Sequence, residues 1–305
     1  SVEKSPNRAP GIDMAAGRWY RERGVSRERR GPMHMLKKGC ETPYGVIRYW
    51  ICRAGENRPW LVFLPGLTAD HRLFDGQVAE LGKGYNCLVW DAPGHGTSRP
   101  FALKFSMEDL ARYLRQIFTA EGIAGPVLVG QSLGGYIAQV YMEAYPGSVS
   151  GFISIDSCPL QRRYYTGLEL ALLKHTKGMY LSIPWRWLLR WGAAGCAVTE
   201  YGQKLMAQMM GEYNKREYCA LADHGYRIFA QAVEAGKAYA ISCPVLLLCG
   251  ERDRAGSAKR YNREWARRSG YPLVWVPGAG HNANTDRIDF VNGQIGEFVQ
   301  GLWDA

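Results

Sequence analysis

Short apolar segments alternate with longer helical segments along most of this 305-residue chain. The apolar segments have the length of strands and almost no polar residues, which is typical of strands buried on both faces. Strand-like segments occur at residues 60–64, 85–90, 127–130, 151–156, 245–249 and 273–276, and helical segments at residues 73–81, 106–121, 133–145 and 258–269. The alternation predicts an α/β fold, in which helices cover both faces of a mostly parallel sheet.

Two local patterns add detail to this fold. Residues 45–52 and 60–64 both read as strands and are joined by the turn-rich residues 53–59, so we expect an opening hairpin. Ser106 followed by Asp109 is typical of a capped helix start. The helix over residues 106–121 is therefore expected to begin at that serine.

One long interval interrupts the alternation. Residues 158–241 have helical character and no strand-like segment, so we interpret them as a helical cap inserted into a body formed by residues 39–157 and 242–305. We expect most of its large apolar side chains to pack within the cap or against the body, and some to face the cleft beneath. These side chains include Trp185, Trp187, Leu188, Leu189, Trp191, Met206, Met209 and Met210.

The positive charge is concentrated at the start of the chain. Residues 1–38 hold ten Lys or Arg against four acidic residues, which is +6 of the formal net charge of +10. This segment is rich in Arg, Gly and Pro and lacks the apolar stretch of a signal peptide, so we expect a basic tail on a near-neutral body. No nucleic-acid-binding motif follows it, and we predict no nucleic-acid partner.

The cysteines and the hydropathy pattern exclude several classes of protein. Eight cysteines in 305 residues are too dilute for a disulfide scaffold and form no C-x-x-C pair, so we expect buried thiols in a cytoplasmic protein. No run of eighteen apolar residues occurs, and we predict no membrane span. The sequence carries no signal for a metal, a cofactor or the oligomeric state.

The segment Gly130-Gln131-Ser132-Leu133-Gly134 matches the pattern G-x-S-x-G. This short pattern is weak evidence alone, but here it follows an apolar strand and opens a helix, which is the placement of a nucleophile elbow. The serine of such a turn has a strained backbone, and the two glycines avoid collisions with the neighbouring strand and helix. We therefore predict that Ser132 is a catalytic nucleophile.

A serine nucleophile needs a base, and histidine is the usual one. Among the six histidines, His281 directly follows the last predicted strand, which places it on a loop at the carboxyl edge of the sheet. His71 and His95 fall in loops near the cleft and are alternatives. His34 lies in the tail, and His175 and His224 lie in the cap, so we expect no catalytic role for these three.

The base needs an acid that fixes its tautomer. Asp253 lies just past the strand at residues 245–249, and the order Ser132, Asp253, His281 is the order found in α/β-hydrolases. Asp156 also ends a strand and is the alternative acid, whereas we expect Glu251 to be a loop residue.

Attack by the serine creates an oxyanion, which needs preorganised backbone donors. The N–H of Leu133, directly after the serine, is the first predicted donor. The N–H of Leu67 is the second, because the loop containing Pro65 and Gly66 leaves its strand at the matching edge. A plain tight turn is the alternative interpretation of this loop.

With these pieces placed, the chain from about Cys40 to Trp303 resembles the α/β-hydrolase superfamily, in its capped branch of esterases, C–C bond hydrolases and haloperoxidase-like enzymes. Residues 91–98, DAPGHGTS, resemble the family's structural D-x-x-G-x-G-x-S loop, so no catalytic step is assigned to His95 or Ser98. The chain departs from many members by having Pro65-Gly66 where they have His-Gly, which puts the geometry of the oxyanion loop in doubt.

The resemblance implies a serine esterase that forms an acyl-enzyme and needs no cofactor or metal. The aromatic and Met-rich cap favours a small-molecule substrate with an apolar acyl or aryl part. Cleavage of a C–C bond in a β-diketone-like substrate by the same triad is one alternative. A non-catalytic receptor for a small ligand is the other. A serine nucleophile argues against haloalkane dehalogenase and epoxide hydrolase chemistry, which relatives perform with a carboxylate.

Overall fold

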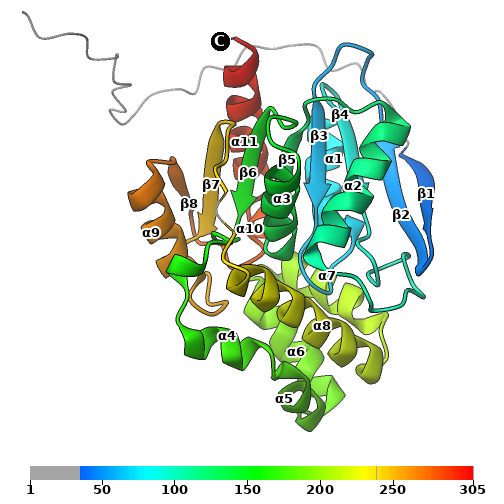
Figure 1. The fold of residues 1–305 in the computed structure, drawn as a ribbon, viewed down its shortest axis with the longest axis vertical. Helices are drawn as coiled ribbons and strands as arrows, with labels where there is room; N and C mark the ends of the chain where they lie inside the picture. The colour runs from blue at the N-terminus through cyan, green and yellow to red at the C-terminus, as the bar shows by residue number, and fades with distance from the viewer. Residues whose placement is uncertain (1–34, 238, 305) are drawn as a thin grey trace, which may run out of the picture. The chain divides into compact units, whose positions relative to one another are not determined.

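The computed structural model describes residues 35–237 and 239–304, which form one sheet with helices on both of its faces (Figure 1). The sheet has eight strands in the order β1-β2-β4-β3-β5-β6-β7-β8. The strands are β1 (Leu36–Thr42), β2 (Gly45–Cys52), β3 (Trp60–Leu64), β4 (Asn86–Trp90), β5 (Val127–Gln131), β6 (Gly151–Ile155), β7 (Val245–Gly250) and β8 (Leu273–Val276). In this sheet order, every neighbouring pair from β4 through β3 to β8 is parallel. The pairs β1–β2 and β2–β4 are antiparallel.

The helices that cover the sheet lie close to their predicted positions. Helices α2, α3 and α9 pack on one face and α1 and α11 on the other (Figure 1). Their bounds are α1 (Asp75–Leu81), preceded by the 3₁₀ helix η1 (His71–Phe74), α2 (Met107–Glu121), α3 (Leu133–Ala144), α9 (Ala258–Ser269), the short α10 (Ala283–Asp286) and α11 (Ile288–Trp303). The predicted cap at the start of α2 is present, because Ser106 and Asp109 bond each other's backbone N–H groups.

The predicted opening hairpin is wrong. The strands over residues 45–52 and 60–64 do not pair, because β4 lies between them in the sheet. β3 is buried along its whole length and pairs in parallel with β4 and β5, whereas β2 is only partly buried. The true hairpin joins β1 and β2.

Strand β1 starts at Leu36, three residues before the predicted start of the body at residue 39. Its two lysines both have partners. Lys37 stands over the Trp50 ring, and Lys38 forms an ion pair with Glu121. The sequence analysis did not predict this strand, because it assigned its first residues, which include Lys37 and Lys38, to the basic tail. Residues 1–34, which make up most of the predicted tail and include His34, lie outside the described residues.

The described part of residues 158–241 contains helices and no strand. After the 3₁₀ helix η2 (Arg162–Tyr164) come α4 (Gly167–Leu173), α5 (Thr176–Ser182), α6 (Trp185–Cys196), α7 (Glu200–Gly211) and α8 (Lys215–Glu234). We refer to these residues as the helical interval. It lies beyond one end of the sheet strands, at the bottom of Figure 1. None of the helices in the described residues combines the length and the apolar character needed to cross a bilayer.

The eight cysteines all lie within the described residues, and each is a free thiol. Five of them, Cys52, Cys87, Cys158, Cys219 and Cys249, are buried. No disulfide therefore contributes to the stability of the described fold, which depends on packing and on polar contacts.

One buried carboxylate joins the first two strands to α2. Glu121 accepts hydrogen bonds from Lys38 Nζ at 2.8 Å and from the Tyr49 hydroxyl at 2.7 Å, and it pairs with Arg53 at 3.5 Å. Burial alone would raise the pKa of Glu121, but the bonds from Lys38 and Tyr49 outweigh this effect and lower it below its ordinary value. The carboxylate form of Glu121 thus stabilises the fold.

We predict that Glu121→Gln lowers the free energy of unfolding at neutral pH by about 1–3 kcal/mol, because charge-assisted bonds to a buried group are lost. In the native protein this contribution is present above the ordinary pKa of glutamate and is lost as pH falls through the lowered folded-state pKa. The difference between the two proteins should therefore shrink in acid. Urea unfolding at pH 7 and pH 4 measures it, and an equal difference at both pH values would contradict the assignment.

Candidate active site

Ser132 occupies a strained turn between β5 and α3. Its φ of 49° and ψ of −116° lie outside the regions that most residues adopt. A Cβ atom on Gly134 would lie 1.8 Å from the Leu64 carbonyl oxygen, and one on Gly130 would lie 2.5 Å from the Gly135 Cα. The turn therefore requires glycine at both positions, as the G-x-S-x-G pattern predicts.

The structure brings Ser132, His281 and Asp253 together. His281 Nε2 lies 3.0 Å from Ser132 Oγ, and His281 Nδ1 lies 3.0 Å from Asp253 Oδ2. Because a carboxylate only accepts, Nδ1 carries the proton, and Nε2 is free to accept from the serine hydroxyl. The second oxygen of Asp253 accepts from the Ala255 N–H at 2.7 Å, which fixes the carboxylate. This is the geometry of a serine that can lose its proton to an imidazole.

The pKa of His281 reflects two opposed effects. Burial of the ring lowers the pKa, and the hydrogen bond and charge of Asp253 raise it. The second effect is larger, so the pKa lies above the ordinary value of 6.5. The pair with Asp253 thus makes the imidazole a stronger base and stabilises its protonated form.

Asp156, the alternative acid, forms no hydrogen bond with His281 in the structure. Its carboxylate accepts instead from the Gly250 N–H at 2.7 Å and from the Ala283 N–H at 3.0 Å. Burial, and next the charge of Asp253, raise its pKa well above the ordinary value. Asp156 therefore links the end of β7 to the segment that follows His281, and the sequence did not indicate this role.

The other candidate residues have different partners. His71 stacks on Trp50 at 3.6 Å and bonds Asp91 at 2.9 Å. His95 bonds the Pro93 carbonyl oxygen, and Glu251 accepts from the Gly278 N–H as a loop residue. Among the described histidines, His281 alone hydrogen-bonds Ser132.

The loop after β3 lies against the Ser132 turn. A Cβ atom on Gly66 would lie 3.2 Å from the Ser132 Cβ and 2.2 Å from Gln131 Oε1, so the two turns touch. The backbone N–H groups of Leu67 and Leu133, the two predicted oxyanion donors, have no hydrogen-bond partner among the described residues. The loop also contains strain at Thr68, whose φ is 64°.

Two side chains that the sequence analysis missed hold the segment around His281. Gln131 donates from Nε2 to the His281 carbonyl oxygen at 2.9 Å. Asp286 accepts from the N–H of Gly280 at 2.8 Å and from those of Val198 and Thr199. Gln131 is a variable position of the serine pattern and Asp286 lies in a helix, so neither carried a signal in the sequence.

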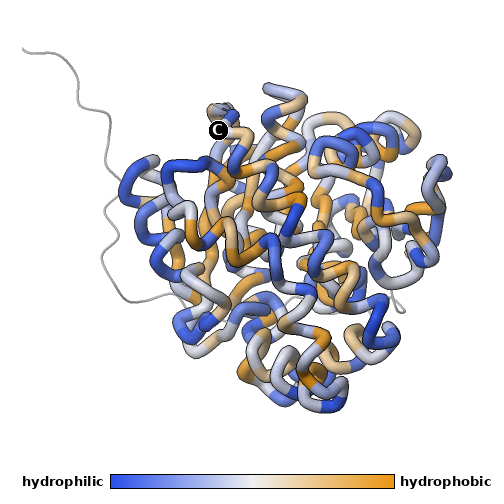
Figure 2. Tube along the Cα trace, turned by 60° about the horizontal axis from the view of Figure 1, so that its bottom comes forward, coloured by the Kyte–Doolittle hydropathy of each residue, from blue (hydrophilic) through white to orange (hydrophobic). Residues whose placement is uncertain are grey.

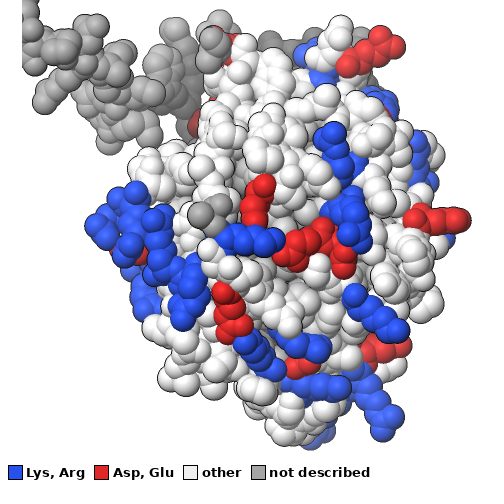
Figure 3. Space-filling model, viewed as in Figure 1, with Lys and Arg blue, Asp and Glu red and all other residues white. Residues whose placement is uncertain are grey.

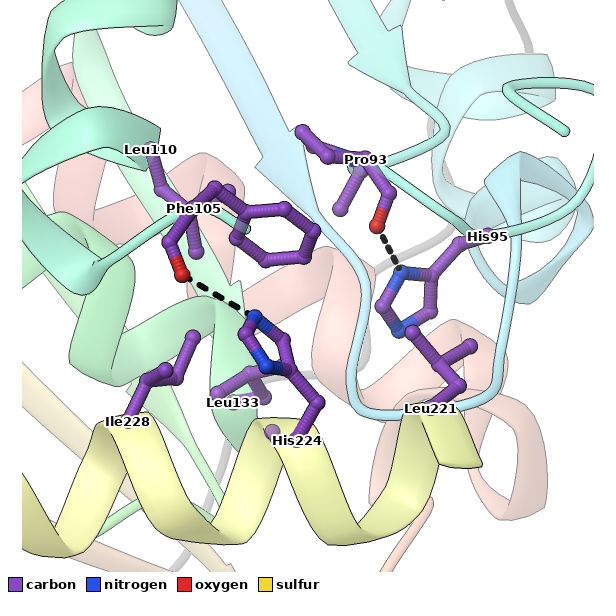
Figure 4. A pocket seen from close by; sticks show the side chains of 10 residues that line it. Pro93, His95, Phe105, Leu110, Leu133, Leu221, His224 and Ile228 are labelled. Carbon is purple, nitrogen blue, oxygen red and sulfur yellow. Dashed lines mark hydrogen bonds between the residues drawn. The ribbon is translucent and has the colours of Figure 1, made fainter. Parts of the chain in front are cut away.

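A small cavity lies beside Leu133, between α8 and the residues of the body that face it (Figure 4). Its volume is about 10 Å³, which is room for one water-sized group. The lining residues are Ala92, Pro93, His95, Phe105, Leu110, Leu133, Leu221, His224, Gly225 and Ile228. His95 donates through Nδ1 to the Pro93 carbonyl oxygen, which leaves its buried Nε2 without a partner among the described residues. Burial lowers the pKa of His95, so this nitrogen is a neutral acceptor.

Two groups of side chains place ligand-type atoms within 4.8 Å of one another, as a metal site would require. They are Asp156 with Asp253 and His281, and Asp70 with His71 and Asp91. In the first group both imidazole nitrogens already bond Asp253 and Ser132, and in the second His71 Nδ1 bonds Asp91. A metal ion would have to displace these bonds.

Comparison with known proteins adds a family match. A model described as the alpha/beta hydrolase family matches residues 61–293. A 2-(acetamidomethylene)succinate hydrolase of Mesorhizobium japonicum is 24% identical over 240 residues, covering 74% of this chain and 82% of that protein. A 2-succinyl-6-hydroxy-2,4-cyclohexadiene-1-carboxylate synthase of Yersinia enterocolitica is 28% identical over 250 residues, covering 74% of this chain and 81% of that protein.

Solved structures share the architecture. A thermophilic esterase from Thermogutta terrifontis, with malate bound, superposes with a TM-score of 0.71 at 22% identity and covers 88% of this chain and 99% of that one. An enol-lactonase from Burkholderia xenovorans superposes with a TM-score of 0.64 at 22% identity and covers 85% of this chain and 100% of that one. At these identities the likeness supports the fold alone.

We predict that Asp253→Asn lowers the pKa of His281, because the charge and hydrogen bond that raise it are lost while burial remains. Titration of the His281 ring protons by NMR measures the shift. Ser132→Ala is the control, since it leaves the bond between His281 and Asp253 in place. An unchanged His281 pKa in Asp253→Asn would show that another group sets it.

Proposed function

The chain belongs to the alpha/beta hydrolase family, and on that premise we propose that it is a serine hydrolase which cleaves small carboxylic esters. The membership confirms the predicted resemblance and the predicted α/β-hydrolase fold. The observation that carries the proposal is the pair of 3.0 Å contacts that His281 makes with Ser132 and Asp253.

In the proposed cycle Ser132 Oγ attacks the ester carbonyl carbon while its proton passes to His281 Nε2. The protonated imidazole then donates this proton to the leaving alkoxide as the C–O bond breaks, and an acyl-enzyme remains. A water molecule, deprotonated by the same nitrogen, attacks the acyl carbon. The imidazolium then returns this proton to Ser132 Oγ as the acyl C–O bond breaks, which releases the acid and the free serine. Asp253 stabilises the imidazolium in both steps and does not itself take the proton.

The tetrahedral intermediates carry a negative oxygen, for which we propose the backbone N–H groups of Leu67 and Leu133 as donors. Both groups are free of protein partners within the described residues, and their turns touch at Gly66. Donors that are already oriented cost no reorganisation when charge develops. The presence of Pro65 in place of the common histidine does not remove either donor, because both are backbone groups.

We propose that the helical interval serves as a cap and that the cavity beside Leu133 receives the apolar acyl part of the substrate. The cavity is closed on one side by Leu221, Gly225 and Ile228 of α8, and a Cβ atom on Gly225 would lie 2.5 Å from the Leu67 side chain. The α8 helix thus covers the oxyanion loop directly. A space of this size holds no more than a methyl-sized group, so the proposal favours acetyl esters.

Cleavage of a C–C bond is the second candidate, because the same three side chains could attack the carbonyl carbon of a β-diketone-like substrate. The 24–29% identical relatives include synthases that make 2-succinyl-6-hydroxy-2,4-cyclohexadiene-1-carboxylate, beside a hydrolase of 2-(acetamidomethylene)succinate. Paired assays with aryl esters and with ring-fission diketones separate this reaction from ester hydrolysis. Rapid labelling of Ser132 by a fluorophosphonate probe would exclude a receptor with an inactive triad.

We predict that Ser132→Ala lowers kcat on aryl acetates by about 10⁵-fold or more and abolishes fluorophosphonate labelling. Asp253→Asn should lower kcat by about 10³–10⁴-fold, because the imidazole loses its orienting acceptor. Asp156→Asn should cost only about tenfold, since it disturbs the loops and not the proton path. Activity of Asp253→Asn close to that of the unmodified protein would transfer the acid role to another residue.

We predict that Leu221→Ala, which enlarges the cavity beside Leu133, shifts the preference toward longer acyl chains. The ratio of kcat/KM for a hexanoate ester to that for an acetate ester should rise about tenfold, because added methylenes gain an apolar contact. An acyl chain-length series on 4-nitrophenyl esters measures this ratio. Leu168→Ala, at a side chain that is 71% exposed on α4, is the matched control and should leave the ratio unchanged.

A further inference from the structure

Exposed apolar side chains are concentrated in the helical interval. Seven of the eleven large hydrophobic side chains that are exposed in the described residues lie between residues 168 and 201. They are Leu168, Leu172, Met179, Leu181, Trp191, Val198 and Tyr201. Single exposed apolar residues are ordinary on any protein surface, but a contiguous patch of them marks a contact site.

Most of the same stretch of chain is free of acidic residues, with Glu169 and Glu200 at its two ends. Residues 170–199 contain Lys174, Lys177, Arg186 and Arg190 and no Asp or Glu, although the whole chain has 28 acidic residues. Lys177, Arg186 and Arg190 have no ion-pair partner among the described residues. In Figure 3 basic side chains lie at the lower end of the molecule, where Figure 1 places α5 and α6. The exposed apolar surface therefore carries a positive border.

The α6 helix combines both properties on its outer side. The rings of Trp187 and Trp191 lie 5.5 Å apart, and the guanidinium groups of Arg186 and Arg190 stand over the Trp187 ring at 5.6 and 5.8 Å. Trp191 is 57% exposed, whereas Leu188, one turn earlier, is buried against the rest of the protein. Tryptophan beside arginine suits the boundary between acyl chains and headgroups, because each side chain has an apolar body and a polar end.

The neighbouring α5 helix adds to this surface and is held in place from beneath. Met179 and Leu181 are exposed, while Tyr180 of the same helix packs against the rings of Tyr218 and Tyr226 on α8. Lys215 at the start of α8 donates to the Leu181 carbonyl oxygen and brings a further cation to the edge. Figure 2, which turns this end forward, shows hydrophobic and hydrophilic segments side by side there. We call the side chains of Met179, Leu181, Trp187 and Trp191, with Lys177, Arg186 and Arg190, the α5–α6 surface.

The acidic residues that approach this surface from α8 are already paired. Asp223 accepts from the Lys177 backbone N–H at 3.2 Å and pairs with Arg227, and Glu234 pairs with Lys174. Glu217 is held by Asn214 at the start of α8 and lies 3.8 Å from Arg99. Because these acidic side chains have other partners, the α5–α6 surface has a net positive charge from Lys177, Arg186 and Arg190.

We propose that the α5–α6 surface docks on a lipid bilayer that contains anionic headgroups, with Met179, Leu181 and Trp191 inserted at the headgroup level. The absence of acidic residues suits the negative surface of such a bilayer, and each Lys or Arg near that surface strengthens binding. This contact is peripheral, and it is independent of the proposed ester hydrolysis.

Flotation of the full chain with vesicles tests the proposal. Binding is expected to vesicles of phosphatidylcholine with 30% phosphatidylserine, and only weak binding to phosphatidylcholine alone. Arg186→Gln with Arg190→Gln should weaken binding to the anionic vesicles about tenfold or more. Met179→Ser with Trp191→Ser should weaken it similarly and remove the blue shift of tryptophan fluorescence on binding.

Matched controls separate this surface from other exposed apolar and basic side chains of the body. Trp303→Ser removes a tryptophan that is 50% exposed at the end of α11, and Lys104→Gln with Arg115→Gln removes two exposed cations of the body. Both variants should bind as the unmodified chain does. Equal binding to neutral and anionic vesicles, full binding by the α5–α6 variants, or self-association through this surface in place of vesicle binding would overturn the proposal.

Discussion

The buried carboxylate of Asp156 holds together the segments on which the site depends. Its two hydrogen bonds, to the N–H groups of Gly250 and Ala283, join the end of β7 to the residues after His281. Asp253 follows Gly250 by three residues, so the same carboxyl group links the segment that carries Asp253 to the segment that follows His281. Because parallel strands end at one edge of the sheet, β5, β7 and β8 deliver their loops to one place, and Asp156 sets their spacing there.

The sequence was sufficient for the elements whose signals are local. Burial on both faces produced apolar runs at β3 through β7, and the glycines around Ser132 are required by contacts as close as 1.8 Å, so these features could be recognised without coordinates. Pairing between strands is not local. β4 inserts between β2 and β3 although it follows both in the chain, and no pattern within residues 45–64 reports that event.

The roles of Asp156 and Asp286 show a second limit of prediction from the sequence. The sequence analysis preferred Asp253 to Asp156 as the acid, but it indicated neither the contacts that Asp156 makes instead nor any role for Asp286. The distinction arises from direction: Asp253 points its Oδ2 at an imidazole nitrogen, whereas Asp156 and Asp286 point at backbone N–H groups. Orientation of this kind depends on tertiary packing, which a single sequence does not contain.

The helical interval is connected to the proposed base by hydrogen bonds that leave little freedom between them. The Asn282 N–H donates to the carbonyl oxygen of Cys196, the last residue of α6, at 2.7 Å, and Asp286 binds Gly280 together with Val198 and Thr199. The helix that carries Trp187 and Trp191 thus ends against the residue after His281. A force that displaces α6 would act on these bonds, so the position of α6 is coupled to the segment around His281, the proposed base.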